Sequence, residues 1–121
     1  MISSGFLSGI EKLAHKKKLS NQGFKLLVAV GGSNKRDQMS AVFNKSGTRQ
    51  NFVKSVTDFL IQNDIDGINI DWQFPREDGT INDKANFVSL TTQLKEAFRT
   101  LKKEINDKDE RKTTNFCFLW I

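Results

Sequence analysis

The sequence predicts an α/β fold, in which helices alternate with the strands of a parallel sheet. Hydrophobic residues recur at helical spacing in three segments, and a short, almost continuous apolar run follows each of them. Such runs are typical of strands that helices cover on both faces. The resulting order, helix then strand three times over, is the pattern that right-handed crossovers between parallel strands produce.

The first half of the chain is predicted to contain two helices and one strand. Apolar spacing predicts a helix from about residue 6 to residue 19, which ends in a basic turn. Residues 24–30 are mostly apolar and end at Gly31-Gly32, so we expect a buried strand there. Thr48 or a neighbour can cap the second helix, which Asn63-Asp64 ends. The apolar face of this helix carries Phe52, Val53, Val56, Phe59 and Leu60.

The second half is predicted to contain two strands around a long helix. Residues 65–72 form a strand that Pro75 stops, and the third helix runs from about residue 83 to residue 105. A charged linker leads to a last apolar strand at residues 115–121. An apolar strand at the end of a chain leaves one edge unpaired, which invites aggregation. We therefore expect residues 1–121 to be a single partial domain, truncated at both ends.

Composition excludes several classes of function. The chain is 37% hydrophobic and 27% charged, without a run of apolar residues long enough to span a membrane. The net charge is +5, and the basic residues cluster only weakly, on predicted helix faces. Aromatic residues do not alternate with them, so nucleic acid is not expected as a partner, and neither is a membrane. Cys117 is the only cysteine, so no intrachain disulfide can form. No metal or cofactor is expected, since no residues have metal-ligand spacing.

The strand at residues 65–72 carries polar residues at every second position. Asn69, Asp71 and Gln73 share one face, and Ile68, Ile70 and Trp72 share the other. A half-exposed antiparallel strand could show the same alternation. The flanking helices favour a covered parallel strand, whose polar face then points into a barrel or crevice. Polar residues near the carboxyl end of a barrel strand usually belong to an active site.

The segment Asp66-Gly67-x-Asn69-x-Asp71-x-Gln73-Phe74-Pro75 resembles the signature strand of glycoside hydrolase family 18. That signature is Asp-Gly-x-Asp-x-Asp-x-Glu, commonly followed by an aromatic residue and Pro. The strand that ends in Gly31-Gly32 resembles the second marker of the family. The resemblance extends from about residue 6 to the end of the chain. It implies a (β/α)8 TIM barrel, of which this chain supplies about three parallel strands with their intervening helices.

The resemblance also implies a mechanism. Family 18 chitinases cleave β-1,4 N-acetylglucosamine polymers with retention, and the substrate's own N-acetyl oxygen is the nucleophile. The Glu of the signature protonates the leaving oxygen, and the Asp two residues earlier orients the acetamido group. Here Gln73 stands at the general-acid position and Asn69 at the inner Asp position, while Asp71 matches. A carboxamide cannot donate a catalytic proton, and losing general-acid catalysis typically costs about 10²–10⁴-fold in rate.

We therefore expect a catalytically inactive, chitinase-like protein that binds chitin or N-acetylglucosamine oligomers. Two alternatives remain open at this point: an active or ancestral chitinase seen as a fragment or variant, and a truncated gene product without independent activity. The candidate catalytic positions are Asp66, Asn69, Asp71 and Gln73, and the candidate sugar contacts are Gly31, Gly32, Trp72 and Phe74. Trp72 shares the side of Ile68, so packing against a helix is the alternative for its ring. The family implies an extracellular location, although the sequence shows no signal peptide.

Overall fold

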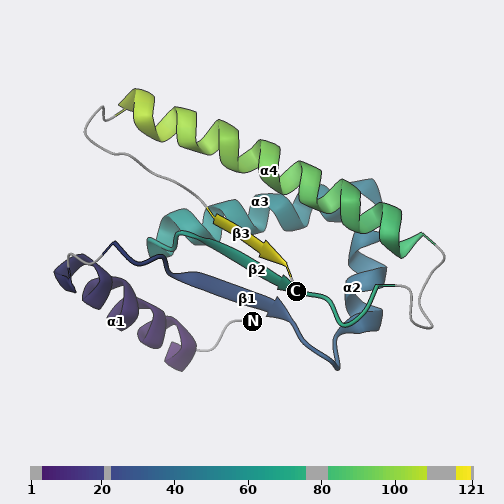
Figure 1. The fold of residues 1–121 in the computed structure, drawn as a ribbon, viewed down its shortest axis with the longest axis horizontal. Coiled ribbons are helices and arrows are strands. Elements are labelled where there is room, and N and C mark those ends of the chain that lie inside the picture. The colour runs from purple at the N-terminus through teal and green to yellow at the C-terminus, as the bar shows by residue number, and fades with distance from the viewer. Residues whose placement is uncertain (1–3, 21–22, 76–81, 109–116, 121) are drawn as a thin grey trace.

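Three parallel strands and four helices make up the part of the chain that the computed structural model describes, residues 4–20, 23–75, 82–108 and 117–120. The strands are β1 (Leu27–Gly31), β2 (Gly67–Asp71) and β3 (Cys117–Trp120), in the order β1-β2-β3. The helices are α1 (Ser4–Ser20), α2 (Arg36–Phe43), α3 (Ser46–Asn63) and α4 (Asp83–Lys108). Figure 1 shows the strands running in the same direction, with α1 below β1 and α4 above β3 in this view. The alternation of helices with parallel strands confirms the α/β class.

The register of the sheet brings the carboxyl ends of its strands to one edge. Leu27 on β1 pairs with Gly67 on β2, and the pairing continues in step to Gly31 and Asp71. β3 pairs with β2 in the same direction, from Cys117 opposite Gly67 onward. Residues that follow β1 and β2 therefore meet at the same edge of the sheet, where α/β proteins usually bind their ligands.

The core lies between β2 and the two long helices. Ile68 and Ile70 are fully buried on the helix side of the sheet. Residues spaced three or four apart on α3 and α4 meet them, as the apolar stripes of the sequence predict. The buried members of these stripes are Val53, Val56, Leu60, Leu90, Leu94 and Phe98. Full burial of each such side chain contributes about 1.5–3 kcal/mol, so this layer accounts for much of the stability of the described fold.

Helix α2 was not predicted from the sequence. It has eight residues, and its buried side chains are Met39, Ser40 and Phe43. Helices this short are marginal alone, because nucleation is costly and only tertiary packing repays it. The sequence signal was two apolar residues four apart, which is too little to distinguish a helix from a loop. The contacts of Met39 and Phe43 with the rest of the core are what stabilise α2.

The ends of α3 differ in how well they were predicted. The N-cap is Lys45, whose side chain makes no capping hydrogen bond, and Thr48 lies inside the first turn. The Thr48 hydroxyl donates to the carbonyl oxygen of Lys45 at 3.0 Å. Of the two options in the prediction, Thr48 or a neighbour, Thr48 is therefore not the cap. The predicted stop is confirmed: Asp64 has the left-handed conformation that Asp tolerates, and α3 ends before it.

Over the described ranges, no helix combines the length and apolar character that crossing a bilayer requires.

Candidate functional site

The open face of β2 carries the polar residues of the signature strand. Asn69, Asp71 and Gln73 are half-buried there, whereas the side chains between them face the helices. In the register of the sheet, Asn69 lies beside Ala29 and Asp71 lies beside Gly31. Ala29 and Gly31 are exposed and carry little or no side chain, so the polar residues have open space next to them. This face is the candidate ligand-binding surface.

Asp71 and Gln73 are joined by a hydrogen bond. Nε2 of Gln73 donates to Oδ1 of Asp71 at 2.8 Å. A carboxylate can only accept, so the amide nitrogen must face Asp71, and Oε1 of Gln73 is turned away as a free acceptor. The peptide bond that follows Gln73 is cis. The pair contains one carboxylate and one neutral amide, and an amide cannot donate a proton as an acid does.

Asn69, two residues before Asp71, adds a second neutral amide to the open face. Its Oδ1 is buried and accepts no hydrogen bond from any residue in the described part of the chain. Leaving a buried acceptor unpaired costs about 1–3 kcal/mol, so a donor from a ligand or a water would be bound favourably there. Among the three residues of the open face, Asp71 is thus the single carboxylate.

Gly31 and Gly32 bring β1 against the carbonyl group of Asp71. The amide of Gly32 donates to the Asp71 carbonyl oxygen at 2.8 Å. Gly31 has φ +126°, and a β-carbon there would lie 2.0 Å from the same oxygen. Only glycine combines that φ with so close an approach. The Gly-Gly pair therefore holds the end of β1 at the end of β2, beside the candidate site.

Trp72 packs away from the open face. Its side chain is 1% exposed and lies between the rings of Phe43 on α2 and Phe87 on α4, at centroid distances of 5.3 and 6.0 Å. This is the packing alternative for Trp72 rather than contact with a sugar. Phe74, by contrast, is 55% exposed at the carboxyl end of β2, where its ring is accessible to a ligand.

Asp66 lies at the opposite end of β2 from Gln73. Its Oδ2 accepts a hydrogen bond from the amide of Leu26 at 2.7 Å and forms an ion pair with Nζ of Lys17 at 2.5 Å. The Asp66 amide returns a hydrogen bond to the Leu26 carbonyl oxygen at 2.9 Å. By strand rise, Asp66 is about 16 Å from Asp71. The structure thus groups Asp71, Gln73 and the two glycines, and places Asp66 where it fixes β1 to β2.

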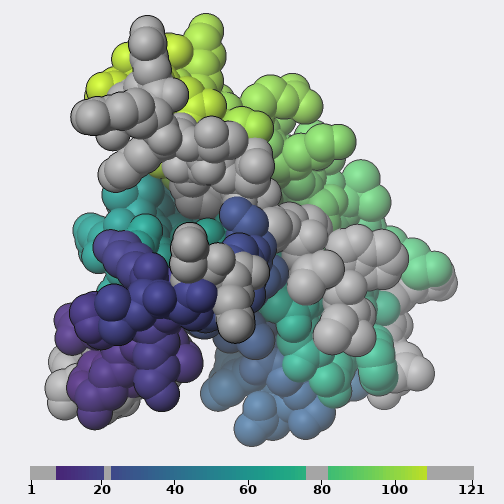
Figure 2. All heavy atoms as spheres, turned by 60° about the vertical axis from the view of Figure 1, so that its left-hand side comes forward, coloured from purple at the N-terminus to yellow at the C-terminus, as the bar shows by residue number. Residues whose placement is uncertain are grey.

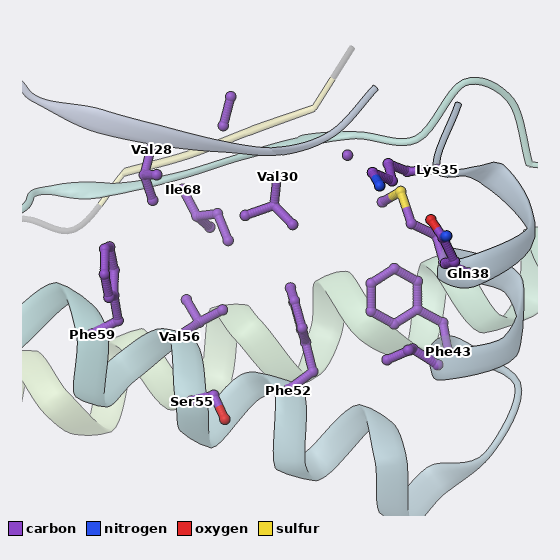
Figure 3. Close-up of a pocket in the computed structure, with 14 residues that line it drawn as sticks. Val28, Val30, Lys35, Gln38, Phe43, Phe52, Ser55, Val56, Phe59 and Ile68 are labelled. Carbon is purple, nitrogen blue, oxygen red and sulfur yellow. The ribbon is translucent and has the colours of Figure 1, made fainter. Parts of the chain in front are cut away.

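An apolar groove lies on the other side of the sheet. It has a volume of about 560 Å³ and is bounded by β1, α2 and α3 (Figure 3). Val28, Val30 and Ile68 line one wall, and Phe52, Ser55, Val56 and Phe59 of α3 line the other (Figure 3). The polar groups around it are those of Lys35, Gln38 and Ser55. Figure 2 shows the surface notched between α1, in purple, and α2, in blue. The walls of the groove are apolar and no carboxylate lines it, so the polar face of β2 remains the candidate site.

Comparison with known proteins decides the family. The family model described as glycosyl hydrolases family 18 matches residues 3–115. The chain belongs to this family. It is 37% identical over 86 residues to an endochitinase of Manduca sexta and 35% identical over 92 residues to a probable chitinase 2 of Drosophila melanogaster. These alignments cover 65% and 74% of the chain.

Solved chitinase structures share the fold. Catalytic domain 2 of the Ostrinia furnacalis Group II chitinase superposes with a TM-score of 0.68 and 32% identity over 75% of the chain. A mutant of that domain has been solved in complex with penta-N-acetylchitooctaose. The chain spans 15% and 19% of the two insect chitinases and 25% of the Ostrinia domain. It is therefore a family 18 chain that contains part of a TIM barrel.

Over residues 4–20, 23–75, 82–108 and 117–120, no three His, Cys, Asp or Glu side chains come close enough to hold an ion. The open face itself offers two amides and one carboxylate, with the exposed ring of Phe74 at its end.

Proposed function

We propose that the polypeptide carrying this chain is a chitinase-like protein that binds chitin or N-acetylglucosamine oligomers without hydrolysing them. The observation behind this proposal is the hydrogen bond from Gln73 to Asp71. It preserves the contact between the residue at the acid position and its neighbour, while the group at the acid position is an amide. A site that keeps this shape can hold a sugar and still lack the proton that glycoside cleavage requires.

The parts of the site fit a barrel interior. In this proposal the three strands of the sheet are adjacent strands of a (β/α)8 barrel, and Asn69, Asp71 and Gln73 face its interior. Asp71 accepts a hydrogen bond from the N–H of an acetamido group, and the free Oε1 of Gln73 accepts from a sugar hydroxyl. Phe74 offers an exposed apolar ring at the rim. The protein would work outside the cell, as the family resemblance implies.

Binding and turnover are the two measurements that test this function. Calorimetry with chitotetraose and chitohexaose should give saturable binding to the full-length polypeptide, and chromatography of the same mixtures should show no shortened products. Gln73→Ala is the matched control, because it removes the amide and leaves the fold. It should weaken binding by about 10-fold, the effect of losing one or two ligand hydrogen bonds.

Restoring the acid tests the reason for inactivity. The double substitution Asn69→Asp with Gln73→Glu should create hydrolysis, at least about 10²-fold above the unmodified polypeptide, since general-acid catalysis contributes about 10²–10⁴-fold. The single substitution Gln73→Glu measures how much of the hydrolysis the acid alone restores, without the second carboxylate that Asn69→Asp adds. Cleavage of chito-oligosaccharides by the unmodified polypeptide at the rate of the restored variant would refute the proposal and favour an active chitinase. Absence of any binding would favour a gene product without independent activity.

A further inference from the structure

We propose that Ser40 and Asp83 are positioning residues, whose hydrogen bond holds the Asp71–Gln73 segment in its ligand-binding arrangement. This inference rests on the proposed function. The Ser40 hydroxyl on α2 donates to Oδ2 of Asp83, the first residue of α4, at 2.8 Å. The two residues are 7% and 0% exposed. The bond therefore joins two helices inside the protein.

The burial of Asp83 exceeds what the start of a helix requires. An acidic residue in the first turn is favoured by the helix dipole, and that effect operates at the surface. Asp37 shows this, because it occupies the first turn of α2 and its side chain is 87% exposed. Removing a carboxylate from water completely is costly unless hydrogen bonds compensate. The hydrogen bond from Ser40 is part of this compensation, and it connects α2 to α4.

This connection lies one helical turn from the rings that hold Trp72. Phe43 follows Ser40 by three residues and Phe87 follows Asp83 by four, so each ring is on the same side of its helix as its partner in the bond. Trp72 lies between the two rings, tilted 60° from Phe43 and 75° from Phe87. The spacing between α2 and α4 consequently determines how deeply the Trp72 ring is held.

The depth of Trp72 in turn sets the positions of its two neighbours. Nε1 of Trp72 is buried and has no hydrogen-bond partner among residues 4–20, 23–75, 82–108 and 117–120, so packing alone fixes the ring. Asp71 and Gln73 precede and follow Trp72 and point to the opposite face. If α2 and α4 separate, the ring moves and the 2.8 Å bond between Gln73 and Asp71 lengthens. A ligand that contacts both residues would then bind less tightly.

Substitution of Ser40 tests the connection through ligand affinity. In the full-length polypeptide, Ser40→Ala should weaken chitohexaose binding by about 3–10-fold, the factor that one lost hydrogen bond corresponds to. Ser55→Ala, the same change at an exposed position of α3, should leave the affinity unchanged. Ser40→Thr keeps the hydroxyl and should restore most of the affinity. Adding Ser40→Ala to Asp83→Ala should cause no further loss, because the pair acts as one unit.

A second measurement separates positioning from general stability. With 15N-labelled glutamine, the side-chain amide signals of Gln73 in the unliganded polypeptide should shift in Ser40→Ala and stay in place in Ser55→Ala. If Ser40→Ala lowers the melting temperature but leaves both affinity and the Gln73 signals as in the wild type, the positioning role is refuted. If the wild type binds no chito-oligosaccharide, the proposed function fails. The Gln73 signals then test the positioning role by themselves: a shift in Ser40→Ala supports it, and unchanged signals refute it. Where the alanine variant does not fold, Ser40→Cys, a weaker donor of similar volume, replaces it in both measurements.

Discussion

Gly31→Ala perturbs the point where β1 meets the signature strand. The added β-carbon would lie 2.0 Å from the carbonyl oxygen of Asp71 and 3.0 Å from Sδ of Met39. The first distance is far inside van der Waals contact, and the oxygen belongs to the backbone, so one of the two strands must move. The hydrogen bond from the Gly32 amide to that same oxygen would be strained by the movement.

The expected destabilisation follows from two costs and one gain. An alanine at φ +126° costs about 1–3 kcal/mol in backbone strain. Forcing a methyl group into a filled space costs about 1–3 kcal/mol more. Replacing glycine returns about 0.4–1 kcal/mol by reducing the entropy of the unfolded chain. The net loss is therefore about 1–5 kcal/mol, which lowers the melting temperature of a barrel of about 250 residues by roughly 2–20 °C.

Thermal unfolding of the full-length polypeptide, followed by circular dichroism, measures this loss. Gly9→Ala is the matched control, because Gly9 lies inside α1 and a β-carbon there would contact nothing within 4 Å. The control should be as stable as the wild type or more stable by up to about 1 kcal/mol. A Gly31→Ala variant that melts with the wild type would refute the argument from close approach. Chitohexaose affinity should also fall, because Asp71 moves with its carbonyl group.

Two further substitutions test contacts away from the open face. Asp66→Ala should lower the free energy of unfolding by about 2–4 kcal/mol in a denaturant titration, because the Leu26 amide and the mostly buried Lys17 lose their acceptor. A loss under about 1 kcal/mol would contradict the role of Asp66 in fixing β1 to β2. Lys54→Ala should change stability by less than about 0.5 kcal/mol, because the ion pair with Asp58 is exposed to solvent, with side chains 75% and 49% accessible.

The face pattern of β2 could be predicted from the sequence because strand geometry allows little else. Side chains alternate along a strand, so Ile68, Ile70 and Trp72 had to share a side once residues 65–72 were identified as a strand. All three are buried against the helices in the structure. The long helices were predictable for a similar reason, since each carries a continuous apolar stripe over several turns.

Features that depend on contacts distant in sequence could not be predicted. Ser40 and Asp83 are separated by 43 residues, and neither belongs to a periodic pattern. Helix α2 depends on Met39 and Phe43 reaching a core built by other elements. The role of Asp66 was also hidden, because its partner Lys17 lies in a lysine-rich turn that resembles an ordinary solvated helix end. Pairing of this kind becomes visible only when the chain is folded.

The arrangement of the signature strand explains how a family 18 chain can keep its fold while the polar residues on one face of that strand vary. The residues that build the strand are separate from those that would perform chemistry. Asp66 fixes one end, and Ile68 and Ile70 fill the core. Asn69 and Gln73 lie on the open face, where an amide in place of a carboxylate alters charge but hardly alters volume. Packing does not oppose an amide at these positions, so the fold of the strand does not depend on whether they carry an amide or a carboxylate.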